Sequence, residues 1–302
     1  MKVPCCLFRN FSYVPPPPLV PVQLPSSGEA HLWYVVPDEV KDPSLLSQYM
    51  DILSPCEKEN VLSFRGEGLK KAAVLARALV RTTIARYQIN GHVNPGSLKF
   101  CKNKYGKPEL HWEHDLGKPE HKVHFNLSHT SSLIACAIAV NSLIGIDVED
   151  KQRKLKSNLV SFARRYFTPH EVKVLSSIQD PELQRQHFIK LWTLKESYVK
   201  ALGRGFSAQP FKTFTIRIRE SESGDICALN CLDNKAGITV ECMDDPNRLS
   251  KNWEFATMEL MGSHYAAVCM ENSAAHQTDQ GSYPMRLIVR KTIPFVKDEL
   301  VS

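Results

Sequence analysis

The stretch FNLSHTSSLIACAIAVNSLIGIDVED, residues 125–150, decides the fold that we expect for this chain of 302 residues. Its apolar runs are short, rich in Ile, Val, Leu and Ala, and separated by Ser and Asn, which is the pattern of buried strands joined by turns. The stretch therefore predicts three consecutive strands, at 123–127, 133–140 and 144–149. Polar side chains stand at both ends of this buried run, and they need a separate explanation.

At the end of the third expected strand, Asp147 and Glu149 form a pair of carboxylates. Residues two apart in a strand point to the same face, so both carboxylates project together while Ile146 and Val148 face the other way. Two neighbouring carboxylates are costly to bury without a partner. A cation such as Mg²⁺, which prefers oxygen ligands, would relieve their repulsion, and a solvated strand end is the alternative interpretation.

A second polar group lies on the segment DPELQRQHFIKLWTLKESYVKALGRG, residues 180–205. Asp180 as N-cap and Pro181 at the first position predict a helix that ends at Gly203 or Gly205. Glu196 and Lys200 are one turn apart on it. They are either a third metal carboxylate and a cation for a phosphate oxygen, or a surface ion pair.

Near the start of the opening stretch, Ser128 and His129 offer a hydroxyl and an imidazole. The pair alone does not establish a catalytic triad, and both groups also bind phosphate well. The turn Gly106-Lys107-Pro108, with Lys104 beside it, adds cations and a close backbone approach. Separate carboxylates, separate phosphate-binding groups and no evident nucleophile indicate metal-assisted phosphoryl chemistry on a bound nucleotide.

The composition is that of an ordinary folded protein, with 43% apolar and 23% charged residues. No apolar run approaches the about 18–20 residues that a membrane span needs. The net charge of +6 favours an acidic or phosphate-rich partner but is weak for a nucleic-acid-binding protein. The nine cysteines fit no zinc pattern. We therefore expect a reducing compartment, no structural metal, no nucleic-acid partner and no membrane partner.

Helical and strand patterns are mixed along the rest of the chain, without a repeat of fixed period. Helical spacing covers 45–64 with a break at Ser54-Pro55, then 68–89, 156–178 and 180–203. Strand patterns cover 31–37, a short run from 98, 211–219, 226–232, 238–243, 253–260, 265–270 and 285–295. This order predicts an α+β fold with antiparallel sheet.

The first 30 residues differ from the rest of the chain. Their run VPPPPLVPVQLP favours an extended or disordered extension. No acidic residue precedes Glu29, which is typical of an organelle transit peptide, although only Lys2 and Arg9 are basic there. We expect a cytosolic protein, with a mitochondrial or plastid location as the alternative.

Four sequence blocks, taken in order, resemble the 4'-phosphopantetheinyl transferases of the surfactin-synthetase-activating type, which include those that act on aminoadipate-semialdehyde dehydrogenase. The blocks are Gly106-Lys107-Pro108, FNLSH at 125–129, GIDVE at 145–149, and WTLKESYVK at 192–200 with Gly203 shortly after. Four blocks in the same order are far more specific than any one of them. The resemblance covers roughly residues 30–270.

The resemblance implies an enzyme that transfers the 4'-phosphopantetheine arm of coenzyme A to a serine of an acidic acyl-carrier or peptidyl-carrier protein, releasing 3',5'-ADP. It implies that Asp147, Glu149 and Glu196 hold Mg²⁺, that Glu196 or Glu149 is the base, and that Lys200 contacts a phosphate. It also implies a coenzyme A site, with Ser128 and His129 at the 3'-phosphate, made by Arg65, Lys104, Lys107, Pro108, Asn126, Ser128, His129 and Lys200.

The fold that the resemblance implies is a monomeric pseudo-dimer of two similar α+β halves, each a helix packed on a mainly antiparallel sheet, with the active site between them. We place the extension at 1–30, the halves at 31–141 and 142–270, and a linker with a final strand at 271–302. We expect that strand to return to the second half. The strands of residues 125–150 would then hold the nucleotide-binding Ser128 and the metal-binding Asp147 apart.

Two other functions fit the same residue types. One is an Mg²⁺-dependent pyrophosphate hydrolase, which would form its product without a carrier protein. The other is a coenzyme A-binding regulatory relative that binds its ligand but transfers nothing. The complete trio of carboxylates favours the transferase, because a binding module has less need of all three.

Overall fold

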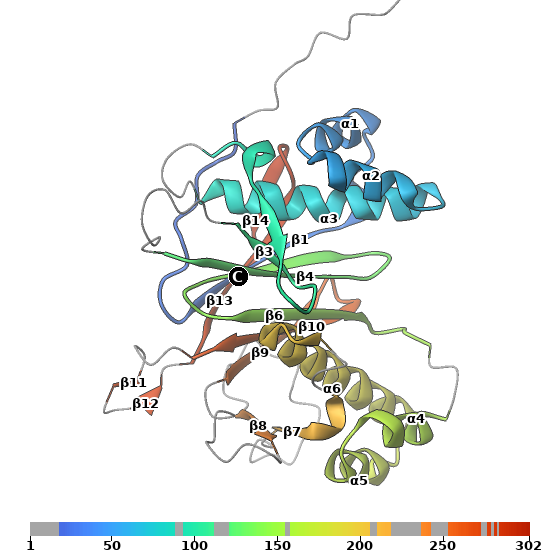
Figure 1. The fold of residues 1–302 in the computed structure, drawn as a ribbon. Coiled ribbons are helices and arrows are strands. Elements are labelled where there is room, and N and C mark those ends of the chain that lie inside the picture. The colour runs from blue at the N-terminus through green and yellow to red at the C-terminus, as the bar shows by residue number, and fades with distance from the viewer. Residues whose placement is uncertain are drawn as a thin grey trace, which may run out of the picture.

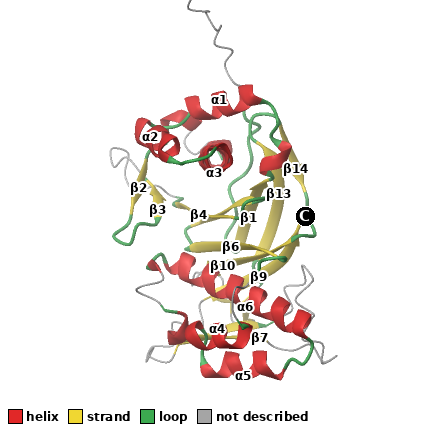
Figure 2. Ribbon diagram, turned by 90° about the vertical axis from the view of Figure 1, so that its right-hand side faces the viewer, coloured by secondary structure: helices red, strands yellow, loops and turns green. Residues whose placement is uncertain are grey.

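The computed structural model describes residues 18–87, 93–111, 121–154, 158–205, 210–218, 237–242, 253–272, 277–278, 281–282 and 284–302. Within these residues two sheets pack face to face, and a long helix covers the outer side of each (Figures 1 and 2). The predicted α+β class is confirmed. The extension up to residue 17 and the strand expected at 226–232 lie outside the described residues.

The first sheet has the strand order β14-β13-β1-β5-β4. Neighbouring strands pair antiparallel, except that β1 and β13 pair in parallel. Its strands are β1 (Glu29–Val35), β4 (Val123–His129), β5 (Ile134–Val140), β13 (Arg286–Ile293) and β14 (Lys297–Leu300). Its outer face is covered by α3 (Glu67–Arg86), beside which lie α1 (Pro43–Asp51) and α2 (Pro55–Ser63).

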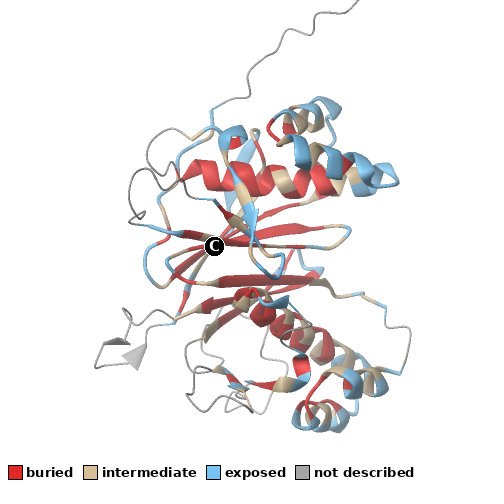
Figure 3. Ribbon diagram, viewed as in Figure 1, coloured by how far each residue is buried: buried red, intermediate tan, exposed pale blue. Residues whose placement is uncertain are grey.

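Strand β5 explains the most apolar part of the opening stretch. Ile134, Cys136 and Ile138 face α3, whereas the alanines that alternate with them face the second sheet. All of these side chains are fully buried. The larger side chains fill the space under the helix, and the alanines let the two sheets approach closely. Because both faces of β5 are covered, its sequence has no polar alternation (Figure 3).

The second sheet is antiparallel and has the order β6-β10-β9. Its strands are β6 (Ile144–Asp150), β9 (Trp253–Leu260) and β10 (His264–Glu271). Its outer face is covered by α6 (Pro181–Leu202), with α4 (Leu159–Tyr166), α5 (Pro169–Ser177) and the strand pair β7 (Phe214–Ile218) and β8 (Ile238–Cys242) packed around that helix.

The predicted boundaries of α6 are confirmed. The Asp180 side chain accepts hydrogen bonds from the N–H groups of Glu182 and Leu183, and Gly203 ends the helix in the left-handed conformation, with φ of 64°. The single helix expected at 156–178 is instead two helices, α4 and α5. Thr168 starts a new capping box with Glu171, which breaks the helical path.

The chain after β10 does not stay with the second sheet. β13 pairs with β1, so the expectation that the final strand returns to the second half is wrong. Arg86 on α3 donates to both carboxylate oxygens of Asp298 on β14, at 2.9 and 2.8 Å, which fixes this strand pair to the first sheet's helix. Short pairs are formed by β2 (Phe100–Lys102) with β3 (Pro108–Leu110) and by β11 (Gln277–Thr278) with β12 (Gly281–Ser282).

Helices that could cross a membrane are not found among the described residues, because none combines the necessary length with sufficient apolar character.

Candidate active site

Strands β4 and β6 lie side by side where the edges of the two sheets meet. The backbone N–H of Ile146 donates to Asn126 Oδ1 at 2.9 Å, and that of Val148 donates to Ser128 Oγ at 3.2 Å. Side-chain oxygens of β4 thus satisfy edge N–H groups of β6. The predicted coenzyme A residue Asn126 is buried in this junction, where it joins the two halves.

The two polar ends of the opening stretch therefore meet at a cluster of three side chains. Ser128 Oγ donates to Asp147 Oδ1 at 2.9 Å, and Lys200 Nζ donates to the same oxygen at 2.7 Å and to Ser128 Oγ at 2.9 Å. The expectation that the strands hold Ser128 and Asp147 apart is wrong, because the stretch folds back and makes β4 and β6 neighbours.

Asp147 keeps one carboxylate oxygen unused. Its side chain is buried, yet Oδ2 has no hydrogen-bond partner among the described residues. Burial raises the pKa of Asp147, while the charge of Lys200 and the hydrogen bonds from Lys200 and Ser128 oppose that rise. A buried acceptor without a partner costs about 1–3 kcal/mol, so Oδ2 marks a position where a ligand would be stabilised.

The charge of Asp147 acts on both Glu149 and Glu196 and raises the pKa of each. Burial raises the pKa of Glu149 to about 7, and the nearby charges of Asp147 and Glu196 add to the rise. The pKa of Glu196 is raised by burial and then by Asp147. The side chains of Asp147 and Glu149 therefore lie on the same side of β6, as predicted, while Ile146 and Val148 face the other sheet.

Gly145 brings α6 against β6. A Cβ at this position would lie 2.0 Å from the carbonyl oxygen of Ser197 and 2.3 Å from the backbone nitrogen of Ala201. The helix backbone therefore rests directly on the strand, which a larger residue would prevent. This close approach carries Glu196 and Lys200, from the same turns of α6, to the carboxylates of β6.

The donor set fits a hard divalent cation. All three acidic side chains offer oxygen, one buried oxygen is unpaired, and each carboxyl has a raised pKa that a cation would lower. No three acidic, histidine or cysteine side chains of the described residues are already gathered into a metal-binding group. Side-chain movement would thus accompany binding of a cation by Asp147, Glu149 and Glu196.

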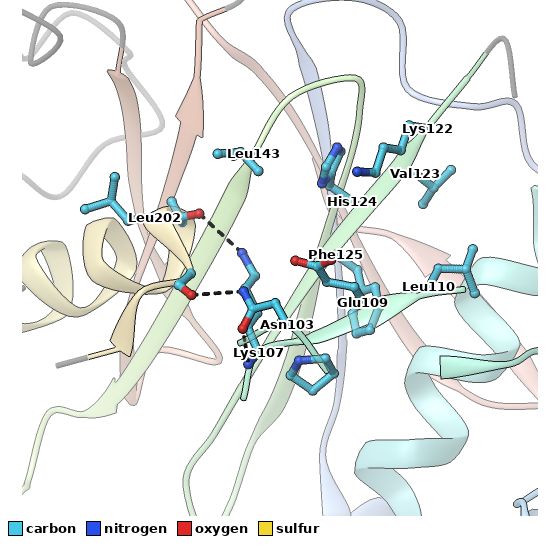
Figure 4. Close-up of a pocket in the computed structure, with 13 residues that line it drawn as sticks. Asn103, Lys107, Glu109, Leu110, Lys122, Val123, His124, Phe125, Leu143 and Leu202 are labelled. Carbon is cyan, nitrogen blue, oxygen red and sulfur yellow. Dashed lines mark hydrogen bonds between the residues drawn. The ribbon is translucent and has the colours of Figure 1, made fainter. Parts of the chain in front are cut away.

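The Lys107 side chain is directed toward the end of α6. Its Nζ donates to the carbonyl oxygens of Lys200 at 2.7 Å and Ile144 at 3.0 Å. It also donates to the carbonyl oxygen of Ala201 at 3.3 Å (Figure 4). Burial lowers its pKa to about 8. A cation suits the carbonyl end of a helix. The donors of Lys107 are thus used at the end of α6, and its contact with coenzyme A stays a prediction.

A small pocket borders Lys107, between the β2–β3 hairpin, the start of β4 and the end of α6 (Figure 4). It encloses about 40 Å³, which is room for a few water molecules. Its polar lining is provided by Asn103, Lys107, Glu109, Lys122 and His124.

The other residues predicted to bind coenzyme A are exposed and, in the described parts of the chain, do not touch the Asp147 cluster. His129 is the last residue of β4, next to Ser128, and Arg65 lies between α2 and α3. The Lys104 ammonium lies 4.9 Å from the centre of the Tyr105 ring, and Pro108 begins β3.

The sequence did not single out Arg153, which is a functional candidate, or Lys195, which forms a buried ion pair. Arg153 Nη1 donates to Glu149 Oε1, and its guanidinium lies 5.2 Å from the centre of the Trp192 ring. Lys195 is fully buried and donates to both oxygens of Glu171 on α5 at 2.7 and 3.0 Å, on the side of α6 away from the carboxylates. The position of Lys195 beside Glu196 was a signal for it, whereas no sequence pattern marked Arg153.

The sequence of the chain was compared with models of known protein families. Residues 42–141 match the family model described as "4'-phosphopantetheinyl transferase, N-terminal", and residues 143–258 match the one described as "4'-phosphopantetheinyl transferase superfamily".

Individual relatives agree with these family models. The chain is 32% identical to 4'-phosphopantetheinyl transferase HetI of Nostoc sp., over 65% of this chain and 76% of that protein. It is 32% identical to 4'-phosphopantetheinyl transferase Sfp of Bacillus subtilis, over 57% and 70% respectively. It is 25% identical to the L-aminoadipate-semialdehyde dehydrogenase-phosphopantetheinyl transferase of Mus musculus, over 78% and 72%.

Among solved structures, the holo-[acyl-carrier-protein] synthase of Thermotoga maritima matches 43% of this chain and 62% of that chain with 18% identity. Its TM-score of 0.31 is too low to compare the two folds. The sequence matches, which run through both sheets and include the blocks around Asp147 and Glu196, show that the chain belongs to the 4'-phosphopantetheinyl transferase superfamily.

Proposed function

We propose that Asp147, Glu149, Glu196 and Lys200 form the site at which this enzyme transfers the 4'-phosphopantetheine arm of coenzyme A to a carrier protein, with 3',5'-ADP as the second product. The observation that carries this proposal is the unpaired Oδ2 of buried Asp147, whose charge helps to raise the pKa of Glu149 and Glu196. Such a site suits a ligand that is itself a cation or arrives with one.

We propose Mg²⁺ as that cation, held by Asp147, Glu149 and Glu196. When bound, Mg²⁺ would neutralise charge on the pyrophosphate of coenzyme A. Lys200 lies within hydrogen-bond distance of Asp147 and is partly exposed, so its ammonium can donate to a phosphate oxygen beside the cation. Ser128, His129 and Arg65 stay proposed contacts of the 3'-phosphate end.

The attacking group belongs to the carrier. The serine hydroxyl of the carrier forms a bond to the phosphorus that bears pantetheine, and the bond from that phosphorus to the oxygen of the departing 3',5'-ADP breaks. The hydroxyl proton passes to a carboxylate of this chain. We propose Glu196, or Glu149 acting through a water molecule, as the base, since burial raises the pKa of both side chains.

The carrier is proposed to be acidic, since the chain has a net charge of +6. Acyl-carrier, peptidyl-carrier and aminoadipate-type carriers are the candidates, which would connect the enzyme to fatty-acid or lysine metabolism. We propose a cytosolic monomer, or an organelle protein if the first 30 residues are a transit peptide.

The test mixes the protein with Mg²⁺, coenzyme A and each of several apo-carrier proteins, and follows the carriers by intact mass spectrometry. We expect one carrier to gain the mass of a single phosphopantetheine arm. Formation of 3',5'-ADP without any carrier would instead identify a hydrolase. Binding of coenzyme A with no change in any carrier would identify a regulatory relative.

A further inference from the structure

Arg153 lies in the turn that follows β6, and its backbone is held there. Its N–H donates to the carbonyl oxygen of Asp150 at 3.0 Å, and the N–H of Gln152 donates to Asp150 Oδ1 at 2.7 Å. The side chain reaches back along the strand, and its guanidinium donates to Glu149 Oε1. The backbone of this residue is thus fixed, while its side chain, which is about one third exposed, keeps freedom to turn.

The indole ring of Trp192 lies against the guanidinium of Arg153. The guanidinium carbon lies 5.2 Å from the indole centre, which is a favourable distance for a cation over an aromatic face. The indole is held by rings around it, among them Phe188 at 6.0 Å and Phe211 at 5.1 Å between ring centres. A fixed indole offers the guanidinium a constant aromatic face to stack on.

The charge of Arg153 acts on the whole carboxylate group. It opposes the rise in the pKa of Asp147, of Glu149 and of Glu196. The hydrogen bond occupies Oε1, one of the two Glu149 oxygens that could bind a metal ion. A divalent cation and this guanidinium therefore compete for the same carboxylate.

We propose that Arg153 is a displaceable counter-ion: its guanidinium neutralises Glu149 in the free enzyme, leaves that carboxylate when a divalent cation binds there, and then donates to a phosphate oxygen of coenzyme A. The inference rests on the function proposed above. A guanidinium that reaches Glu149 also reaches the immediate neighbours of an ion held by Glu149. Its planar fork matches two phosphate oxygens as well as it matches a carboxylate.

The test measures two affinities of the variant Arg153→Met. Binding of Mn²⁺ to the protein alone is followed by the loss of the free-ion electron paramagnetic resonance signal. Binding of coenzyme A at saturating Mg²⁺ is followed by titration calorimetry. Because a partly exposed ion pair is modest in strength, we expect Mn²⁺ to bind roughly fivefold more tightly and coenzyme A to bind at least about fivefold more weakly. A merely structural role of Arg153 would weaken both.

Two further variants sharpen the result. Arg165→Met removes the same charge from an exposed position on α4 and should change each affinity less than about twofold. Arg153→Lys keeps the charge but not the planar fork, so Mn²⁺ affinity should stay near that of the unchanged protein while coenzyme A still binds more weakly. Similar changes in Arg165→Met and Arg153→Met would overturn the inference.

The transfer assay separates this inference from the proposed function. Suppose that Arg153→Met binds Mn²⁺ more tightly and coenzyme A more weakly, but the unchanged protein modifies no carrier. This result would support the proposed role of Arg153 and remove the transferase assignment. If the protein modifies a carrier but the two affinities of Arg153→Met are unchanged or both fall, the transferase assignment stands and the proposed role of Arg153 is overturned. Absence of Mn²⁺ binding by the unchanged protein would also overturn the counter-ion.

Discussion

At the scale of single residues, Asp147 carries the most specific expectation. Asp147→Asn removes the negative charge while keeping the shape of the side chain. Because even the loss of an outer partner of a metal ligand costs about 10–100-fold in affinity or activity, we expect kcat/KM for the carrier to fall at least about hundredfold. The measurement is the mass-based transfer assay at fixed Mg²⁺, with the thermal midpoint recorded for the same samples.

Asp150→Asn is the matched control, because Asp150 lies on the same strand and accepts a hydrogen bond within its own turn. Its transfer rate should stay within about threefold of the unchanged protein, in line with the small effects of substitutions away from such sites. A transfer rate of Asp147→Asn close to that of Asp150→Asn would remove Asp147 from the site.

At the scale of secondary-structure elements, the contact of α6 with β6 depends on Gly145. In Gly145→Ala the new Cβ would clash with the helix backbone, so α6 must shift outward. We expect a loss of about 1–3 kcal/mol in the free energy of unfolding, as for other overpacked sites, with reduced transfer in the fraction that stays folded. Urea denaturation followed by circular dichroism measures the first effect.

Gly68→Ala on α3 should have the opposite effect, which is a gain in the free energy of unfolding. Gly68 is an exposed residue of α3, and a Cβ there meets nothing within 4 Å. This change should stabilise the protein by about 0.5–1 kcal/mol, because alanine is the better helix former. Equal stability changes of the same sign in both variants would show that the contact at Gly145 does not hold α6 in place.

Local patterns predicted the elements around the site well. Period-two alternation placed Asp147 and Glu149 on one face of β6, and the capping residues set both ends of α6. The division between α4 and α5 was missed, although Thr168-Pro169 is a start signal of the same kind as Asp180-Pro181. Such signals are local, so a single sequence contains them in readable form.

The contacts between distant segments could not be predicted in this way. The hydrogen bond between Ser128 and Asp147 depends on β4 lying against β6, and the place of Lys107 depends on where α6 ends in space. The family resemblance supplied Glu196 as a second metal ligand beside Asp147, but it placed Lys200 at a phosphate and did not supply its contact with Asp147. It did not supply Arg153, because that side chain belongs to no block of the resemblance.

At the scale of the whole molecule, the structure predicts how fragments of the chain behave. A fragment of residues 18–141 contains β1, β4, β5 and α3 but lacks β13 and β14, so one edge of β1 and the cation Arg86 lose their partners. We expect this fragment to lack a cooperative thermal transition, because unpaired strand edges and buried charges are costly. Addition of a peptide of residues 284–302 should restore the transition, and a cooperative transition without that peptide would contradict the prediction.

Two partly buried histidines, His124 and His187, make the stability of the molecule depend on pH. Burial lowers the pKa of His124 and His187 to about 4. The unfolded chain therefore binds more protons than the folded one below about pH 6.5, so these groups make stability fall as the pH falls. Glu149, with its raised pKa, acts in the opposite direction, so variants must be compared at each pH.

The comparison uses His124→Gln and His187→Gln against the unchanged protein. Between pH 6.5 and pH 5, each variant should lose up to ~2 kcal/mol less in the free energy of unfolding than the unchanged protein does, since one pH unit corresponds to about 1.4 kcal/mol. His111→Gln, at an exposed position, is the control. Curves that run parallel in all four proteins would contradict the prediction.

The parallel pairing of β1 with β13 also determines when the first sheet can form during synthesis of the chain. The register joins Glu29 to Arg286, so β1 leaves the ribosome well before its partner strand β13. The second sheet and α6 are synthesised in between and can form earlier. The first sheet can be completed only after residues 286–300 have emerged, which exposes the edge of β1 throughout elongation. A nascent-chain chaperone that covers β1 would thus act until β13 has emerged.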